Sequence, residues 1–180
     1  MNPQQVLAGL QERRCRIHDL QAPAQAGVYA LFLSSPAALP SFRVHEVEPL
    51  YLGVSANLAE REFDTHFHSG HTGFSTVRRS LGAILKDALD LTARPRGKGR
   101  SEQSFRCYRF DPDGEERLTQ WMTETLEVSV QPAPDYAALE KALIRFACPV
   151  LNLTGWPNPY RAEIKALRKK CVDEARRRRP

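Results

Sequence analysis

Two short apolar stretches decide the fold: Gly27-Val28-Tyr29-Ala30-Leu31-Phe32-Leu33 and Pro49-Leu50-Tyr51-Leu52-Gly53-Val54. Both contain β-branched and aromatic residues and are bounded by turn-forming residues, a pattern typical of β-strands. The proline-rich stretch 34–49 between them is predicted to be a long connection. The sequence therefore predicts two adjacent strands at the start of the domain.

Helical patterns surround these two strands. Helical spacing of apolar residues predicts a first helix over about 3–19, and further helices near 115–126, 135–147 and 160–178. Asn57 can cap a helix that runs to about His68, and Ser75 or Thr76 can cap one that runs to about Leu91. A third strand is predicted over 104–110, followed by a turn at 111–114. We expect an α/β fold with a small, mostly antiparallel three-stranded sheet flanked by helices, and extra helices at both ends of the chain.

Length and composition limit the class of protein. A chain of 180 residues suits one buried core, so we expect a single domain over 1–180. No stretch approaches the roughly 20 apolar residues that span a bilayer, so a membrane role is not expected. The N-terminal residues show no secretion signal, and the four cysteines stand singly, without zinc-site or disulfide spacing. These features predict a cytoplasmic protein with free thiols.

Positive charge is concentrated at the end of the chain. The net charge is +5, and residues 161–180 hold about nine Lys or Arg against three acids. Such an asymmetry favours a polyanionic partner such as nucleic acid, although a charged terminal helix can also be a solvated face.

Several motifs together resemble a known family. Gly27-Val28-Tyr29 and Tyr51-Leu52-Gly53 look like the GIY and YIG elements of the GIY-YIG nuclease superfamily. The segments 57–61, 139–144 and 149–152 are similar to the family's arginine-bearing helix, closing helix and PxLN turn, and they occur in the family's order. The resemblance covers about residues 26–155. It implies a GIY-YIG-like core and a metal-dependent endonuclease that hydrolyses DNA phosphodiester bonds.

The same resemblance implies roles for individual residues. It makes Tyr29 a general base toward the attacking water and makes Tyr51 a group that positions the phosphate or that water. It makes Arg61 a phosphate-binding group, whose planar charged fork suits a phosphate in which charge develops. It places Asn152 near the metal ligand, where a structural role is an equal alternative. Because an ordinary tyrosine has a pKa of about 10, Tyr29 needs cationic charge nearby to act as a base.

Glu140 is the residue that the resemblance assigns to the metal. On a helix it lies four residues from both Tyr136 and Ile144, so it shares a partly apolar stripe. A carboxylate there needs a partner, and Mg²⁺ (or Mn²⁺) would bind one carboxylate together with a substrate phosphate. A salt bridge at the edge of the helix is the alternative.

Three features depart from the family pattern. His66 is the best histidine candidate, as proton shuttle or phosphate donor, but it follows Arg61 by five residues where the family often has four. His68 lies closer to the helical face of Arg61, so the choice of histidine stays open. Val54 stands where some members carry a lysine, and the connection between the tyrosines is longer than usual.

Basic residues outside the motifs are candidates for holding DNA. Arg78 and Arg79 lie in the first turns of a predicted helix, where backbone amides also attract phosphate. Arg96, Lys98 and Arg100 form a basic loop that would add sequence-independent attraction. Each of them could also be a solvated surface charge.

Two other functions compete with a nuclease. A non-catalytic nucleic-acid-binding module on the same fold would fit the basic tail and the missing lysine. A protein-interaction domain would use the helix around Trp121-Met122 as an exposed apolar surface, although core packing is the expected use of that helix. With one site per chain, a double-strand break would require a homodimer or two binding events.

Overall fold

The structure is a computed structural model that describes residues 2–40, 42, 44, 47–59 and 62–178. The chain divides into two compact units, Met1–Phe63 with Thr123–Tyr160 and Asp64–Met122 with Arg161–Pro180. Each unit therefore joins segments that are far apart in the sequence. The single-domain organisation expected over 1–180 stays a prediction.

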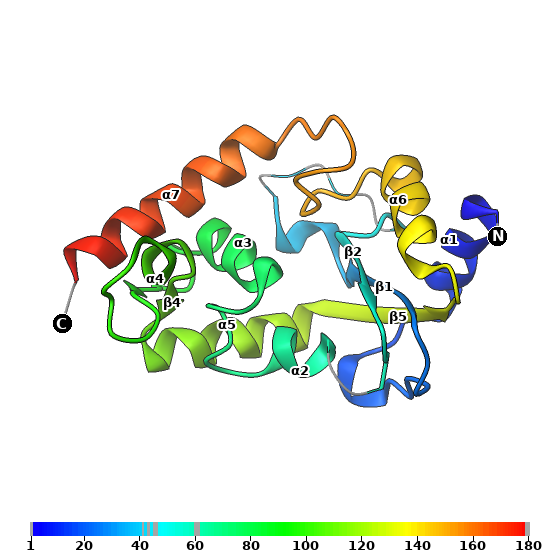
Figure 1. Ribbon diagram of the computed structural model, residues 1–180, viewed down its shortest axis with the longest axis horizontal. Helices are drawn as coiled ribbons and strands as arrows, with labels where there is room; N and C mark the ends of the chain where they lie inside the picture. The colour runs from blue at the N-terminus through cyan, green and yellow to red at the C-terminus, as the bar shows by residue number, and fades with distance from the viewer. Residues whose placement is uncertain (1, 41, 43, 45–46, 60–61, 179–180) are drawn as a thin grey trace. The chain divides into compact units, whose positions relative to one another are not determined.

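The first unit is built around a three-stranded antiparallel sheet (Figure 1). Its elements are α1 (Pro3–Glu12), η1 (Ile17–Asp19), β1 (Gly27–Leu33), η2 (Pro36–Ala38), β2 (Tyr51–Ser55), β5 (Leu126–Pro132) and α6 (Tyr136–Ala147). The strand order is β2-β1-β5, and both neighbours of β1 run antiparallel to it. The expected α/β class, with a small antiparallel sheet flanked by helices, is confirmed.

The third strand of this sheet is not the one expected from the sequence. It is β5, which follows directly on α5 (Pro112–Thr125). Residues 104–110 instead contribute to α4 (Glu102–Arg106) and β4 (Arg109–Phe110). Helix α4 forms because the hydroxyl of Ser101 accepts a hydrogen bond from the Ser104 amide at 3.2 Å, which caps its first turn.

The predicted turn at 111–114 is also wrong, because these residues begin α5. Pro112 is its first residue, a position where the missing amide hydrogen costs nothing. The Asp111 carboxylate accepts a hydrogen bond from the Gly114 amide at 3.0 Å. A Pro-Asp-Gly sequence therefore starts a helix here once an acid caps it.

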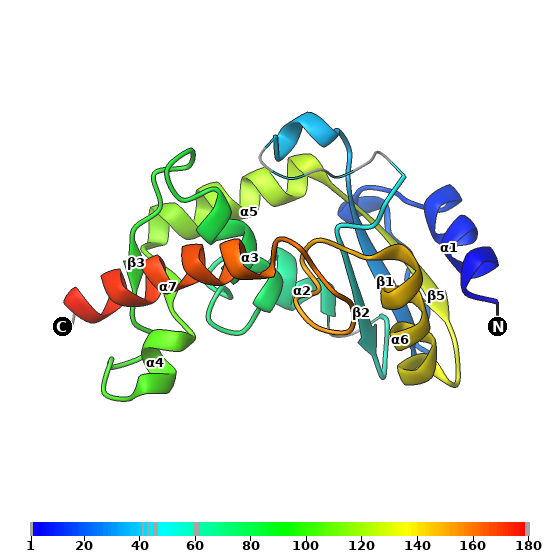
Figure 2. The ribbon, with the colours of Figure 1, turned by 90° about the horizontal axis from the view of Figure 1, so that it is seen from above.

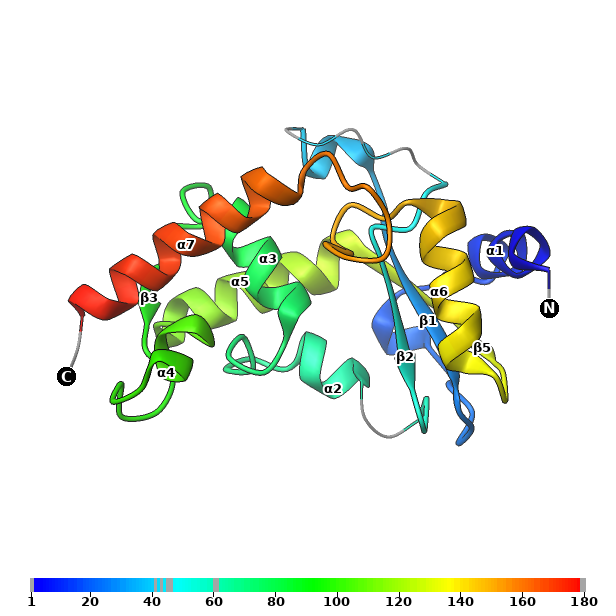
Figure 3. The same cartoon turned by 45° about the horizontal axis from the view of Figure 1, so that its top comes forward.

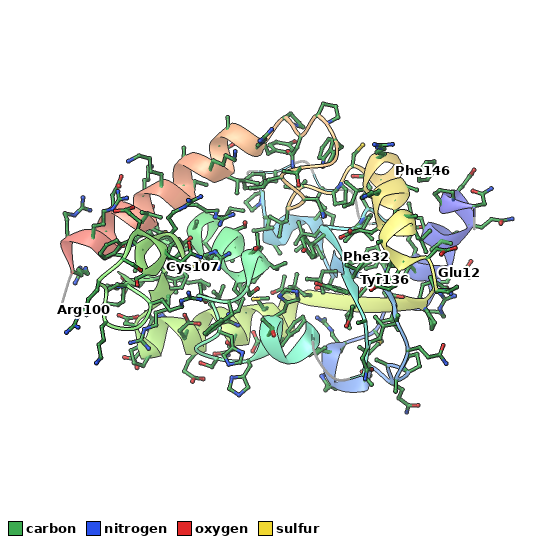
Figure 4. All side chains as sticks on the ribbon, viewed as in Figure 1. Glu12, Phe32, Arg100, Cys107, Tyr136 and Phe146 are labelled. Carbon is green, nitrogen blue, oxygen red and sulfur yellow. The ribbon has the colours of Figure 1, made fainter. Side chains whose placement is uncertain are left out.

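One face of the sheet carries the hydrophobic core of the first unit. Val28, Ala30 and Phe32 of β1 project to this face, and α1 and α6 cover it (Figure 3). Figure 4 labels Phe32 on β1 and Tyr136 on α6, which pack in the same apolar cluster. Because side chains alternate along a strand, Tyr29 projects to the opposite face. The first helix ends at Glu12 instead of near residue 19.

The second unit is mainly helical. It contains α3 (Thr76–Ile84), β3 (Ala93–Arg94), α4, β4 and α7 (Arg161–Arg177), and α7 packs along α3 (Figure 2). The strands β3 and β4 form a separate two-stranded ribbon. Two helices, α2 (Glu62–Phe67) and α5, carry the chain from one unit to the other.

The helix around Trp121 and Met122, an alternative candidate for a protein-interaction surface, contributes to the interior of the second unit. Met122 is fully buried, and Trp121 is half-buried. The segment around them therefore serves core packing, as expected. No helix among the described parts of the chain combines the length and apolar character that a bilayer crossing requires.

Candidate active site

Tyr29 and Gly53 face each other across β1 and β2. They are direct partners in the antiparallel register, and Tyr29 is only 2% exposed. A Cβ atom added at Gly53 would lie against the Cζ and hydroxyl oxygen of Tyr29, closer than the 3.0 Å that real Cβ atoms keep. The glycine of the second motif is therefore needed to make room for the phenol of the first.

Close neighbours also require a glycine at position 27, in the first motif. A Cβ atom at Gly27 would stand 2.7 Å from the Leu58 Cδ1 atom and 2.9 Å from the Pro132 Cα atom. Gly27 pairs with Ser55 on one side and with Pro132 on the other. Only a residue without a side chain fits between these neighbours.

Tyr51 completes the pair of phenols. It lies two residues before Gly53 on β2, so it projects to the same face as Tyr29 at a diagonal position. The two ring centroids are 6.1 Å apart and the ring planes are tilted by 44°. Tyr51 is half-buried. The sheet thus presents two phenols side by side, one buried and one accessible to a ligand.

Glu140 lies on α6, which packs on the opposite face of the sheet from the two tyrosines. The preceding residue, Leu139, belongs to the core cluster on that face. Helix α6 packs against β1 and against the edge strand β2. A ligand shared by Glu140 and the phenols would therefore have to reach around the β2 edge.

The Glu140 carboxylate has the properties of a cation ligand. It is half-buried, and among the residues that the structure describes it makes no hydrogen bond or ion pair. Desolvation by burial raises the pKa of Glu140 above its ordinary value, while Lys141 opposes the shift. A bound cation would remove this penalty.

The donor set around Glu140 limits which cation fits. Within the described ranges, no group of three or more His, Cys, Asp or Glu side chains gathers to hold a metal. Zn²⁺ sites usually need three or four protein ligands, whereas Mg²⁺ usually keeps several waters and uses one or two carboxylates with a substrate phosphate. A single carboxylate that has no partner within the described ranges fits the second case.

Asn152 holds the outer edge of β2. Its Oδ1 atom accepts a hydrogen bond from the Leu52 amide at 2.8 Å, and its Nδ2 atom donates to the Leu52 carbonyl at 2.8 Å. The Leu151 amide also donates to the Leu50 carbonyl at 3.0 Å. Asn152 is 8% exposed, so its amide is committed to the strand that carries Tyr51. This contact favours the structural alternative for Asn152.

The comparison with protein families agrees with this geometry. The family described as GIY-YIG catalytic domain matches residues 27–170, which is most of the chain. This chain belongs to the GIY-YIG family. Neither a curated protein nor a solved structure matches it. The match begins at Gly27 and includes both phenols, Glu140 and Asn152, so the residues described above lie within the catalytic domain.

Two further candidates of this GIY-YIG domain are Arg61 and His66. Arg61 lies outside the described residues. His66 belongs to the second unit, where it is buried and its Nδ1 atom lies 2.7 Å from the Ser75 hydroxyl. Burial, followed by the charge of Arg78, lowers the pKa of His66 to about 4. The ring is therefore neutral at pH 7.

Arg78 does not lie at a phosphate-facing surface, contrary to expectation. Its side chain is 0% exposed and forms an ion pair with Glu115 at 2.8 Å. It also donates hydrogen bonds to the Thr72 hydroxyl and to the His66 carbonyl. Ser75 does cap α3, because its hydroxyl accepts from the Arg78 amide at 3.0 Å. The side chain of Arg78 turns inward to pair with a buried acid, which would otherwise lack a counter-charge.

Arg79 is also largely enclosed. Its guanidinium donates to the carbonyls of Thr72 and Gly73, and little of the residue reaches solvent. Burial, then the nearby Arg168, lowers the pKa of Arg79. Both arginines of this helix start thus hold the 66–80 segment together.

The basic loop after β3 remains accessible. Lys98 and Arg100 are exposed, and Figure 4 labels Arg100 on this loop. Arg96 donates to the Gly73 carbonyl at 3.3 Å, and its guanidinium lies over the Phe74 ring at 4.9 Å. Phe74 is 66% exposed, a feature that sequence reasoning missed. An exposed aromatic ring beside a cation suits contact with nucleic acid.

Proposed function

We propose that this protein is a metal-dependent endonuclease that hydrolyses DNA phosphodiester bonds by a GIY-YIG-type mechanism. The single observation that carries the proposal is the pair of phenols on one sheet face, Tyr29 and Tyr51, whose ring centroids are 6.1 Å apart above a glycine that no larger residue could replace. Family membership supports it. The Glu140 carboxylate, which has no hydrogen-bond or ion-pair partner among the described residues, supports a role for Mg²⁺ or Mn²⁺.

In the proposed reaction, the oxygen of a water molecule attacks phosphorus while one ester P–O bond breaks. Tyr29, as its phenolate, takes the proton of the attacking water and then releases it to solvent, and the leaving alkoxide receives a proton from solvent. Tyr51 donates a hydrogen bond to a phosphate oxygen, and Arg61 adds permanent positive charge as charge develops there. A divalent cation held by Glu140 would neutralise phosphate charge and lower the pKa of water.

His66 stays the candidate for a proton shuttle or a hydrogen-bond donor to phosphate, with one change. Because its ring is neutral at pH 7, it would act as a neutral hydrogen-bonding group and not as a cation. The remaining proposed DNA contacts are Arg96, Lys98 and Arg100. A cytoplasmic location is proposed as well, because the four cysteines are free thiols.

A cleavage assay on plasmid, single-stranded and branched DNA with Mg²⁺ or Mn²⁺ tests the function. Tyr29→Phe and Glu140→Gln should each reduce cleavage by at least about a hundredfold, as expected for loss of a proton acceptor or a metal ligand. The matched controls are Tyr136→Phe, a half-buried tyrosine on the other sheet face, and Glu163→Gln, an exposed acid on α7. Both controls should retain wild-type activity.

Two results would contradict the proposal. Cleavage undiminished by Glu140→Gln would remove this residue from the metal site. Salt-sensitive DNA binding without cleavage under either metal would identify a non-catalytic nucleic-acid-binding module instead. The order of the plasmid products also matters. With one site per chain, nicked plasmid should appear first. If a homodimer cuts both strands, the rate at which linear plasmid forms should depend more steeply on protein concentration.

A further inference from the structure

The second unit contains a pocket that the reaction does not use. It has a volume of about 320 Å³ and lies between the β3–β4 ribbon, the start of α5 and the end of α7. Its lining residues are Arg94, Pro95, Gly97, Arg109, Phe110, Asp111, Pro112 and Arg178. We call it the arginine pocket. Its size is at the lower end of small-ligand sites, roughly 300–1,000 Å³, which suits a phosphate with an attached sugar.

The two-stranded ribbon places two arginines opposite each other. Arg94 of β3 is the direct antiparallel partner of Arg109 of β4. The adjacent pair, Ala93 and Phe110, is buried, so the two arginines share the exposed face. Directly opposed like charges on neighbouring strands are destabilising, and their Cβ atoms are typically about 5 Å apart. The ribbon therefore maintains a repulsion that an anion between the two side chains would relieve.

The negative charge around the pocket does not balance these arginines. Within the described part of the chain, the guanidinium groups of Arg94 and Arg109 have no hydrogen-bond or ion-pair partner. The one lining acid, Asp111, caps α5 by accepting from the Gly114 amide. The lining residues thus hold three positive charges against one negative charge.

The third arginine is only weakly neutralised. Arg178 lies 3.3 Å from Glu174, measured from its Nε atom to Oε1. The same carboxylate also pairs with Lys86 at 3.0 Å and accepts from the Ala93 amide at 3.2 Å. Because Glu174 is shared between two cations, the pocket keeps a surplus of positive charge on its α7 side as well.

We propose that the arginine pocket binds a backbone phosphate of DNA, away from the bond that is cut. Arginine offers planar paired donors that match phosphate oxygens, and arginines from β3, from β4 and from the residue after α7 line this pocket. The choice of DNA as the source of the phosphate rests on the proposed function. The pocket would hold the duplex in place without reading its sequence.

Fluorescence anisotropy with a duplex DNA, in EDTA and over a series of salt concentrations, tests this site without cleavage. The variant R94Q/R109Q should weaken binding by about tenfold and lower the slope of log affinity against log salt by about one, as for loss of one phosphate contact. The matched control is R106Q/R161Q, which removes two exposed arginines of the same unit that lie outside the pocket. It should leave the slope unchanged.

Further measurements separate binding from folding. The variant R94K/R109K keeps the charge but loses the paired donors, so it should retain the salt slope with reduced affinity. R94Q/R109Q should melt at the same temperature as the wild type or higher, because it removes a repulsion. Equal DNA affinities of R94Q/R109Q and R106Q/R161Q would overturn the proposal.

A titration with inorganic phosphate distinguishes the source of the anion. Saturable phosphate binding that R94Q/R109Q abolishes, with DNA affinity unchanged, would show that the pocket takes a free phosphate and would overturn the DNA assignment. Cleavage is measured separately. Weaker DNA binding by R94Q/R109Q supports the pocket proposal even if no cleavage is seen with either metal. Cleavage by the wild type supports the proposed function even if R94Q/R109Q binds DNA normally.

Discussion

The side-chain amide of Asn152 makes two hydrogen bonds to the backbone of Leu52, at 2.8 Å to the amide and 2.8 Å to the carbonyl. These two residues are one hundred positions apart in the chain. The contact supplies the partner that the outer edge of β2 would otherwise lack, next to the two motif residues Tyr51 and Gly53.

Asn152→Ala should lower the free energy of unfolding by about 1–3 kcal/mol, because it leaves the buried amide and carbonyl of Leu52 without a partner. Cleavage should fall as well, because β2 positions Tyr51. Denaturant unfolding in a Trp121→Phe background, followed by the fluorescence of Trp156, reports on this unit. Thr154→Ala, an exposed change in the same loop, is the control. Equal stability of the two variants would refute the positioning role.

Gly53→Ala should destabilise the sheet by about 1–3 kcal/mol and reduce cleavage, because the new methyl group overlaps the Tyr29 ring. In a Tyr29→Ala background, Gly53→Ala should lower the free energy of unfolding by less than it does in the wild type, since the ring is gone. Gly9→Ala is the control, because its methyl group meets only the flexible end of Arg13 and favours the α1 helix. Strict additivity of the two changes would argue against the contact.

Arg78→Ala should lower the free energy of unfolding by about 3–5 kcal/mol, because it leaves the buried carboxylate of Glu115 without its counter-charge. Replacing both residues, as in Arg78→Met with Glu115→Leu, should cost less than the single change. Arg106→Ala, at an exposed position, should be nearly neutral. Weaker DNA binding by Arg78→Ala at full stability would instead restore Arg78 as a phosphate contact.

Stability should depend on pH through His66. Its pKa is lowered from 6.5 to about 4 in the folded protein, so between these values the unfolded chain binds a proton that the folded chain does not. The free energy of unfolding should therefore be highest above about pH 6.5 and fall by roughly 1.4 kcal/mol per pH unit toward pH 4 from this group.

His66→Gln should remove that part of the pH dependence, whereas His18→Gln, at an exposed histidine, should keep it. Trp121 fluorescence in a Trp156→Phe background follows the second unit, to which His66 belongs. The same slope in wild type and His66→Gln would show that the ring titrates normally.

Local patterns in the sequence are sufficient for much of the first unit. Their β-branched and aromatic residues and the turn residues that bound them locate β1 and β2, and helical periodicity locates α6, because these signals come from residues next to each other in the chain. The motif order also indicates the family. The strand β5 escapes such reasoning, because Leu126 follows Thr125 of α5 without any turn residue to mark the boundary.

The roles of several side chains depend on partners far away in the sequence. A glycine at position 53 looks like a weak point of a strand until the register sets Tyr29 over it. Arg78 resembles a surface charge at a helix start until Glu115, thirty-seven residues later, draws it into the interior. Arg94 and Arg109 become one anion site only through strand pairing. Composition and periodicity act over a few residues, whereas burial, register and charge pairing arise when distant segments pack, and this packing decides which polar groups can meet a substrate.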